Sequence, residues 1–277
     1  MGEHEVNLPL GKPTVYRDEY DPALLCPFPR QPKRAELGLG ATLPFAGFDL
    51  WNAYELSWLT PVGKPVVAMA EFRFPCTSPC LIESKSLKLY LNSFNQTRFT
   101  DPAAVAAIIE ADLTSACGAA VSVTLQPLAA TTGAGLVDLP GRCLDDLEVA
   151  IDCYALDPGL LAGAADPGCI VAETLHSHLL KSTCLVTRQP DWASVLIRYR
   201  GARIDHVALL RYLVSYRQHS EFHEQCVERI FSDLLRHCRP EQLTVYARYT
   251  RRGGLDINPF RSNFEPHPAH WLRLARQ

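Results

Sequence analysis

An internal repeat limits the folds open to this chain more than any other feature of the sequence. The sequence YLNSFNQ at residues 90–96 is echoed by YLVSYRQ at residues 212–218, at an offset of 122 residues (212 minus 90). Further pairs are identical or similar at this offset or one residue less: Ile82 with Ile204, Glu83 with Asp205, Asp112 with Asp233, and Leu113 with Leu234. The sequence therefore predicts two copies of one structural unit.

The two copies share a predicted order of elements, which is a strand, two helices and a closing strand. The strands, marked by β-branched, aromatic or alternating apolar residues, are at residues 66–74, 121–125, 195–199 and 243–249. The first helix of each copy has apolar residues at helical spacing. The second helix has Asp101 as N-cap and Gly118 after its end in the first copy, and covers residues 220–237 in the second. Paired helices can cover one face of an antiparallel sheet, so the predicted fold class is α+β.

The charged residues of the two copies are not repeated. Lys85 and Lys88 of the first copy align with apolar residues of the second, while His223 and Glu224 of the second align near Pro102 of the first. Each copy therefore carries a different part of the charged set. This favours one composite site at the junction of the halves.

Length and composition indicate a cytoplasmic globular protein. The chain has 277 residues, of which 47% are hydrophobic, which is enough for two domains; we place these at residues 1–150 and 151–277. Its net charge of -3 gives no general attraction to nucleic acid. Glu3, His4 and Glu5 stand where a signal peptide would need apolar residues, and the longest apolar runs are far shorter than the roughly 20 residues of a membrane span. We expect no membrane partner and no direct nucleic-acid partner.

Cys184 stands out among the ten cysteines. It lies among hydroxyl residues, with Lys181 and Arg188 near it in the sequence and Asp191 soon after. Nearby cations favour the thiolate, which is the nucleophilic form of cysteine. A buried structural cysteine ahead of a loop is the alternative, because free cysteine is among the most buried residue types.

His223 and Glu224 are expected near the start of a helix. An imidazole can move protons near neutral pH, and a carboxylate can accept two hydrogen bonds from an amidine-like edge such as that of guanine. The alternative is an ordinary acidic residue stabilised by the helix dipole. The same two interpretations apply to Glu83.

The sequence RRGG at residues 251–254 follows a predicted strand. Glycines let a backbone approach a ligand closely, and arginines can hold phosphate. A solvated basic turn is the alternative. The sequence contains no Rossmann fingerprint, and Cys76 and Cys80 lack the second ligand pair of a zinc site, so no metal site is predicted.

Four separated blocks of the sequence closely resemble the NADPH-dependent 7-cyano-7-deazaguanine reductases, the nitrile reductases of queuosine biosynthesis. The blocks are residues 83–90, 184–192, 223–226 and 251–262. The resemblance spans nearly the whole chain and is to the long, two-module form of the family, which fits the internal repeat. It implies two tandem tunnelling-fold modules, each an antiparallel sheet with paired helices, and a homodimer.

The resemblance also implies a role for each residue of the site. Cys184 would attack the nitrile carbon to give a covalent thioimide, with Asp191 as the proton donor and His223 as a further catalytic residue. The deazaguanine would be bound by Ile82, Glu83, Ser84, His223 and Glu224. The cofactor NADPH would be bound by Ser84, Lys85, Arg252 and Gly253. The implied product is 7-aminomethyl-7-deazaguanine, an intermediate of the tRNA queuosine pathway, at the expense of two NADPH.

Two other functions remain open. A pterin- or purine-processing enzyme on a related fold would use a carboxylate to anchor the base and a metal ion for hydrolysis, but the sequence shows no cluster of metal ligands for it. A non-catalytic base-binding protein would leave Cys184 inert. Thiol reactivity separates this second alternative from the reductase.

Overall fold

Two units of structure are present in the computed structural model, which describes residues 16–131, 135–185, 187–268 and 273–277. Unit 1 consists of residues 1–33, 48–134 and 251–256, and unit 2 of residues 34–47, 135–250 and 257–277. Glu3, His4 and Glu5 lie outside the described residues. The module boundary placed at residue 150 stays a prediction.

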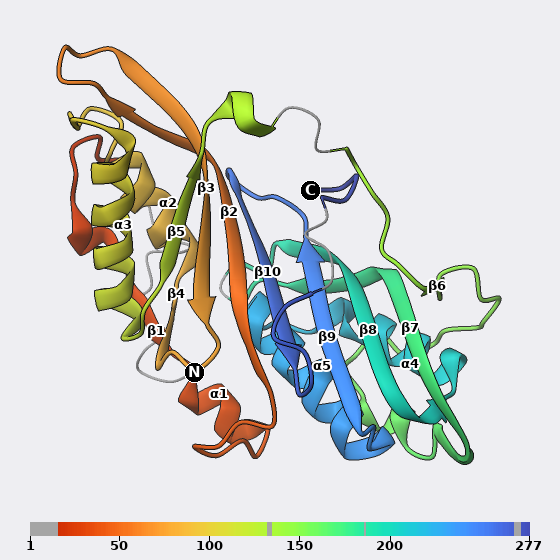
Figure 1. The fold of residues 1–277 in the computed structure, drawn as a ribbon. Coiled ribbons are helices and arrows are strands. Elements are labelled where there is room, and N and C mark those ends of the chain that lie inside the picture. Colours follow the sequence, from red (N-terminus) through yellow and green to blue (C-terminus); the bar gives the residue numbers. More distant parts are fainter. Residues whose placement is uncertain (1–15, 132–134, 186, 269–272) are drawn as a thin grey trace. The chain divides into compact units, whose positions relative to one another are not determined.

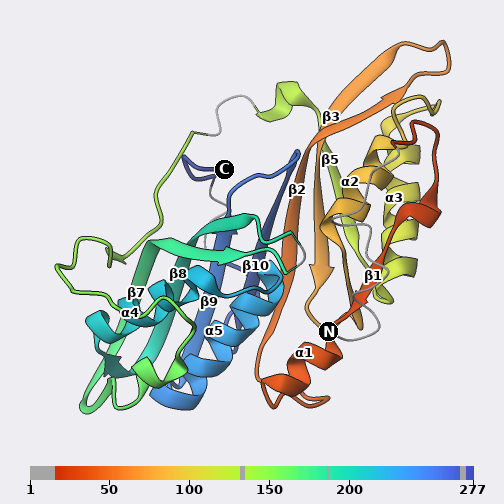
Figure 2. The same cartoon turned by 180° about the vertical axis from the view of Figure 1, so that it is seen from behind.

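Unit 1 contains a three-stranded antiparallel sheet with the order β5-β3-β2. Its main elements are β2 (Ala46–Leu59), β3 (Pro65–Pro75), β5 (Ser122–Gln126), α2 (Ser84–Asn92) and α3 (Pro102–Cys117). Figures 1 and 2 show both helices on the same side of this sheet. A small antiparallel pair, β1 (Pro27–Pro29) with β4 (Cys80–Ile82), leads into α2, and two short 3-10 helices are at Pro22–Leu24 and Leu128–Thr131.

Unit 2 contains a sheet with the order β10-β9-β8-β7-β6, antiparallel except for the pair β6–β7. Its strands are β6 (Arg142–Cys143), β7 (Ala165–Thr183), β8 (Pro190–Ile204), β9 (Gln242–Tyr249) and β10 (Leu255–Ser262). Its helices α4 (His206–Ser215) and α5 (His223–Cys238) cover one face of the sheet (Figures 1 and 2). Short 3-10 helices are at Pro158–Leu161 and Tyr216–Gln218, and the short helix α1 (Gln31–Glu36) carries residues of both units.

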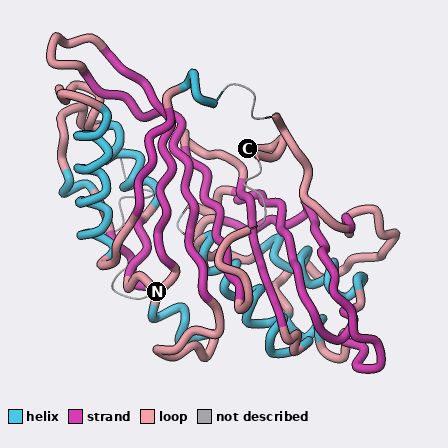
Figure 3. Tube along the Cα trace, in the orientation of Figure 1, coloured by secondary structure: helices cyan, strands magenta, loops and turns pink. Residues whose placement is uncertain are grey.

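The sequence repeat corresponds to a repeated structure. Each unit runs through two antiparallel strands, two helices and a further strand. Figure 3 shows the helices in cyan and the strands in magenta along the trace. In unit 1 the Tyr90 hydroxyl donates to Asp112 at 2.6 Å, and in unit 2 the Tyr212 hydroxyl donates to Asp233 at 2.7 Å. Each tyrosine lies on the first helix of its pair and each aspartate on the second. The predicted α+β arrangement with antiparallel sheets is confirmed.

The predicted ends of α3 are confirmed, whereas the predicted start of α5 is wrong. Asp101 accepts a hydrogen bond from the Ala104 amide at 2.9 Å, and Gly118 ends α3 with a φ of 76°. Helix α5 begins at His223, three residues later than predicted. The reason is that Ser220 pairs with the end of β7, which holds this residue in extended backbone.

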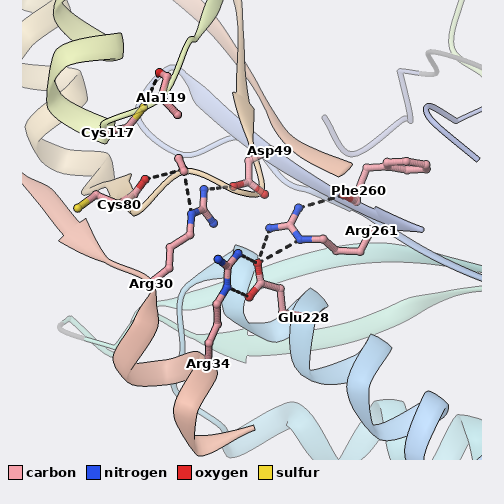
Figure 4. Close-up of polar contacts among 10 residues, drawn as sticks. Arg30, Arg34, Asp49, Cys80, Cys117, Ala119, Glu228, Phe260 and Arg261 are labelled. Carbon is pink, nitrogen blue, oxygen red and sulfur yellow. Dashed lines mark hydrogen bonds and ion pairs between the residues drawn. The ribbon is translucent and has the colours of Figure 1, made fainter. Parts of the chain in front are cut away.

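Two long strands, β2 and β7, have no counterpart in the sequence-based prediction. In β2 the carboxylate of Asp49 is buried in unit 1 and accepts a hydrogen bond from Arg30 at 2.5 Å (Figure 4). A buried charge interrupts the alternation that marks a strand. A β-bulge between Ala53 and Leu56 shifts the alternation again.

Unit 2 also buries a group of three charges. Glu228 on α5 accepts hydrogen bonds from Arg34 at 2.7 Å and from Arg261 on β10 at 2.8 Å (Figure 4). Such a group is costly to form, but removal of one member leaves a buried charge uncompensated.

No helix of the described residues is long and apolar enough to cross a membrane.

Candidate active site

The first group of predicted site residues surrounds the start of α2 in unit 1. Strand β4 brings Ile82 into register with Pro27, and the Glu83 amide donates to the carbonyl of Cys26 at 2.9 Å. The Glu83 side chain is the N-cap of α2, because its two oxygens accept from the amides of Lys85 and Ser86, each at 2.7 Å. This geometry fits the helix-cap interpretation of Glu83. The carboxylate keeps lone pairs for further donors, so Glu83 can cap the helix and also bind a ligand.

The Glu83 carboxyl group is completely buried, and its electrostatic environment is mixed. Burial raises its pKa, and the amides of Lys85 and Ser86 and the charges of Lys88 and Lys85 only partly offset this effect. Protonation of this carboxyl group is therefore easier than in water. Ser84 and Lys85 are half-buried in the first turn of α2, beside the buried Ile82.

The turn after β9 forms a tight hairpin in unit 1. The Arg252 amide donates to the Leu255 carbonyl at 2.8 Å, and the two residues between them, Gly253 and Gly254, have φ values of 55° and 75°. Positive φ at both central residues is the requirement of a two-residue turn of type I′. The Arg251 guanidinium lies 4.0 Å from the centre of the Tyr54 ring.

This turn lies against α2. A Cβ atom placed on Gly253 would come within 3.1 Å of the Cε and Nζ atoms of Lys88. Next to this contact is a cavity of about 330 Å³, whose lining includes Ala53, Glu55, Lys88, Asn92, Gly253 and Gly254. The structure thus places the predicted Gly253 beside Lys88, a lysine outside the predicted cofactor set. Its spacing of one helical turn from Lys85 is the sequence signal for it.

The second group lies in unit 2 at the loop between β7 and β8. Cys184 follows the last residue of β7 and is buried. Its amide donates to the Gln189 carbonyl at 2.9 Å, and its carbonyl accepts from the Arg188 amide at 3.0 Å. Arg188 has a φ of 56°, which a non-glycine residue rarely adopts. Backbone hydrogen bonds therefore define the loop that carries this thiol.

Asp191 and His223 are adjacent in this unit. Asp191 pairs with Ser182 in the β7–β8 register and is only 2% exposed. Its Oδ1 atom lies 3.8 Å from Nε2 of His223, whose ring packs edge-on against Tyr249 with centroids 4.1 Å apart. Thr183, next to Cys184, anchors the chain that precedes α5, since its amide donates to the His219 carbonyl at 2.8 Å. An imidazole next to a buried carboxylate is suited to moving protons.

Glu224 occupies the first turn of α5 and is buried. The helix dipole stabilises a negative charge at this position. Just before the helix, Glu221 is also buried and binds His219 and Arg229. Burial alone would raise the pKa of Glu221, but these two partners outweigh it and lower the pKa to about 2.

Burial is the main cause that raises the pKa of five cysteines outside the predicted site: Cys80, Cys117, Cys143, Cys226 and Cys238. A raised pKa reduces the thiolate fraction, so these five thiols are poor nucleophiles near neutral pH.

The predicted site residues form two groups, one in each unit. Unit 1 contains Ile82, Glu83, Ser84, Lys85, Arg252 and Gly253, and unit 2 contains Cys184, Asp191, His223 and Glu224. The assignment of Arg252 and Gly253 to unit 1 was not expected, because they come from the second half of the sequence. The composite site and the roles of its members stay predictions.

One cluster of reactive side chains escaped the sequence analysis. Cys143, His176 and His178 of unit 2 each place one potential ligand atom within 4.8 Å of the others. The parallel pairing of β6 with β7 brings Cys143 opposite His176 across 33 residues of sequence (176 minus 143). The signal available in the sequence was the pair of histidines two residues apart.

Comparison with known proteins places the chain in a family. The model of the N-terminal part of the nitrile reductase 7-cyano-7-deazaguanine reductase matches residues 16–125, and that of the QueF-like proteins matches residues 190–268. The NADPH-dependent 7-cyano-7-deazaguanine reductase of Azoarcus sp. (strain BH72) is 61% identical over 97% of this chain and 95% of its own length. The chain belongs to the 7-cyano-7-deazaguanine reductase family.

Other relatives in this nitrile reductase family are similarly close. The NADPH-dependent 7-cyano-7-deazaguanine reductase of Dechloromonas aromatica (strain RCB) is 62% identical over 92% of this chain and 89% of its own length. The reductase of the same name from Chromobacterium violaceum is 57% identical over 97% of this chain and 96% of its own length. The nitrile reductase family expected from the four sequence blocks is thus confirmed.

Proposed function

We propose that the chain reduces the nitrile group of 7-cyano-7-deazaguanine to the aminomethyl group of 7-aminomethyl-7-deazaguanine, with NADPH as reductant. The observation that carries the proposal is the identity of about 60% to reductases with this name over nearly the full chain. The product belongs to the queuosine pathway of tRNA modification, and the enzyme acts in the cytoplasm on the free base.

Cys184 is the nucleophile in this proposal. Its thiolate adds to the nitrile carbon, and the nitrile nitrogen takes up a proton, which gives a covalent thioimide. Asp191 supplies that proton, and His223 beside it exchanges protons with the carboxyl group. The 3.8 Å between Asp191 and His223 supports this assignment.

NADPH, when bound, supplies two hydrides, one to the thioimide and one after the thiol has left. The overall change is one nitrile, two NADPH and two protons to one amine and two NADP⁺. Ser84, Lys85, Arg252 and Gly253 bind this cofactor, and Lys88 adds a positive charge. The ammonium of Lys88 and the glycine turn line one cavity together with the carboxylate of Glu55, so Lys88 is the group there that would contact a phosphate.

Ile82, Glu83, Ser84, His223 and Glu224 bind the deazaguanine. Glu224 accepts hydrogen bonds from the guanine-like edge of the base, for which a buried carboxylate is well suited. Glu83 contributes its remaining lone pairs, while Ile82 packs against the base. The enzyme is a homodimer of chains with two tandem tunnelling-fold modules. The repeated tyrosine–aspartate pairs support the tandem arrangement.

The test is an assay of the purified chain with NADPH and 7-cyano-7-deazaguanine. The expected result is the oxidation of two NADPH per amine formed, with the amine identified by mass spectrometry. The base that lacks the nitrile is the control and should cause no oxidation. Binding of the nitrile without NADPH oxidation would favour the non-catalytic base-binding protein, and a hydrolysed product would favour the metal-dependent enzyme.

The cofactor assignment has its own measurement. The ratio of kcat/KM for NADPH to that for NADH should be well above one, because arginine binds the additional phosphate through charge-assisted hydrogen bonds. Arg252→Ala should lower this ratio. Equal use of NADH by the parent would contradict the preference, and an unchanged ratio in the variant would show that Arg252 does not recognise the phosphate.

A further inference from the structure

Three side chains with nitrogen and sulfur ligands converge on one edge of the sheet in unit 2. His176 and His178 are two residues apart on β7, and side chains at this spacing point to the same face of a strand. Cys143 on β6 is in register with His176 in the parallel pair. One ligand atom of each residue lies within 4.8 Å of the other two.

The surroundings of His176 fix which of its ring nitrogens is available. Nδ1 of His176 is 3.1 Å from the carbonyl oxygen of Pro140. A carbonyl can only accept, so Nδ1 carries the hydrogen and Nε2 of the neutral ring has a free lone pair. Nδ1 of His178 is 2.8 Å from the Ser194 hydroxyl, which can accept in the same way. Metal-binding histidines usually donate their second ring N–H to an oxygen of this kind.

A carboxylate lies next to one of the histidines but outside the cluster. Oδ1 of Asp138 is 3.4 Å from Nε2 of His178, and it accepts a hydrogen bond from the Leu139 amide at 2.8 Å. The three ligand atoms that converge belong to Cys143, His176 and His178.

The local charge also favours a cation. The carboxylate of Asp145 accepts hydrogen bonds from the Ser177 hydroxyl at 2.6 Å and the His178 amide at 2.9 Å, so a negative charge lies beside the histidines. A metal ion deprotonates a thiol that it coordinates. Two imidazoles and a thiolate are ligands that zinc takes in tetrahedral sites.

We propose that Cys143, His176 and His178 bind one zinc ion. The ion ties β6 to the middle of β7. Three protein ligands leave the fourth tetrahedral position to a water molecule. The six residues from His178 to Cys184 along β7 correspond to roughly 20 Å, so the ion takes no part in chemistry at the thiol. The inference is independent of the proposed reductase function.

Cobalt(II) is a suitable probe, because it replaces zinc in tetrahedral sites and absorbs visible light there. Protein stripped of metal with a chelator and then titrated with Co²⁺ should bind one ion per chain. It should show the intense thiolate-to-cobalt band and the visible bands of tetrahedral cobalt, and zinc should abolish both. Absence of a thiolate band in the parent protein would overturn the proposal.

Two variants and a control identify the ligands. Cys143→Ser should lose the thiolate-to-cobalt band, and His178→Ala should weaken cobalt binding by ten-fold or more. Cys153→Ser removes a half-buried thiol outside the cluster and should leave the titration unchanged. Because His178 is partly exposed, its variant is expected to fold even if the Cys143 variant does not. Unchanged spectra in His178→Ala, or loss of the band in Cys153→Ser, would overturn the assignment.

A thermal measurement gives an independent readout. A ligand that binds the folded state raises the melting temperature with its concentration. Zinc added to the stripped parent protein should therefore raise Tm, and the rise should vanish in His178→Ala. The same rise in both proteins would overturn the proposal, because the ion would then bind elsewhere.

Discussion

At the scale of single residues, Asp191 has one candidate partner nearby in the sequence, Cys184, and one that is distant, His223. Cys184 and Asp191 are close in sequence and lie on either side of one β-hairpin loop, so their proximity follows from local structure. His223 is distant in sequence and reaches Asp191 because Thr183 binds the segment before α5. Nothing in a single sequence encodes that contact. The cap formed by Glu83 shows that a candidate ligand can also have a structural role.

Glu224 is predicted to anchor the base. Glu224→Ala would leave donors of the bound base unpaired, at a cost of about 1 to 3 kcal/mol for each donor. Affinity for 7-cyano-7-deazaguanine should fall by about five-fold or more. Calorimetry on a Cys184→Ala background measures binding without adduct formation. The exposed Glu241→Ala is the matched control and should bind as the parent does. Unchanged affinity in Glu224→Ala would refute its assignment.

Glu221 should make stability depend on pH in the acid range. Its folded pKa of about 2 lies below the unfolded value of 4.5, so its contribution is complete above about pH 5 and is lost as pH falls towards 2. Removal of one partner of a buried ion pair costs about 3 to 5 kcal/mol. Urea unfolding should thus give Glu221→Gln a lower free energy of unfolding than the parent at pH 6, and this difference should shrink towards pH 3. A difference that stays constant with pH would contradict this explanation.

At the scale of elements, the two ends of α3 were predictable, whereas the start of α5 and several strands were not. Asp101, Pro102 and Gly118 delimit α3 because each satisfies a local requirement of a helix end. Strand β2 was missed because the buried Asp49 depends on Arg30, a partner outside the strand. Strand β6 has only two residues, and its pairing with β7 depends on the fold and not on local propensity.

The hairpin turn after β9 offers a test of the cofactor site. Gly253→Ala would place a methyl group 3.1 Å from Lys88 and strain a backbone with positive φ. Gly163→Ala is the matched control, because Gly163 has a φ of 71° and nothing within 4 Å of its Cβ position. Both variants should lose about 1 kcal/mol of stability, but only Gly253→Ala should raise KM for NADPH. Equal KM values in the two variants would argue against a cofactor role for this turn.

At the scale of the whole molecule, the repeat was the most reliable part of the sequence analysis. One tyrosine and one aspartate related by the repeat form the same hydrogen bond in each unit, Tyr90 with Asp112 and Tyr212 with Asp233. The order of elements could be predicted from it. The division into units could not, since residues 251–256 cluster with residues far away in the sequence.

The repeat also supplies an internally matched pair of variants. Asp112 accepts hydrogen bonds from both Tyr90 and Tyr20, so Tyr90→Phe leaves it one tyrosine donor. Asp233 is buried and accepts from Tyr212. Tyr212→Phe should therefore lower the free energy of unfolding by about 1 to 3 kcal/mol, and Tyr90→Phe should lower it by less. Urea unfolding of both variants measures the difference. A larger loss for Tyr90→Phe would contradict the comparison.

The central claim is that a covalent bond between Cys184 and the nitrile carbon precedes reduction. The most direct measurement is the intact mass of the protein mixed with 7-cyano-7-deazaguanine in the absence of NADPH. We predict an increase by the mass of one substrate molecule in the parent and in the control Cys169→Ser, and none in Cys184→Ala. An adduct that persists in Cys184→Ala, or no adduct in the parent, would contradict the account.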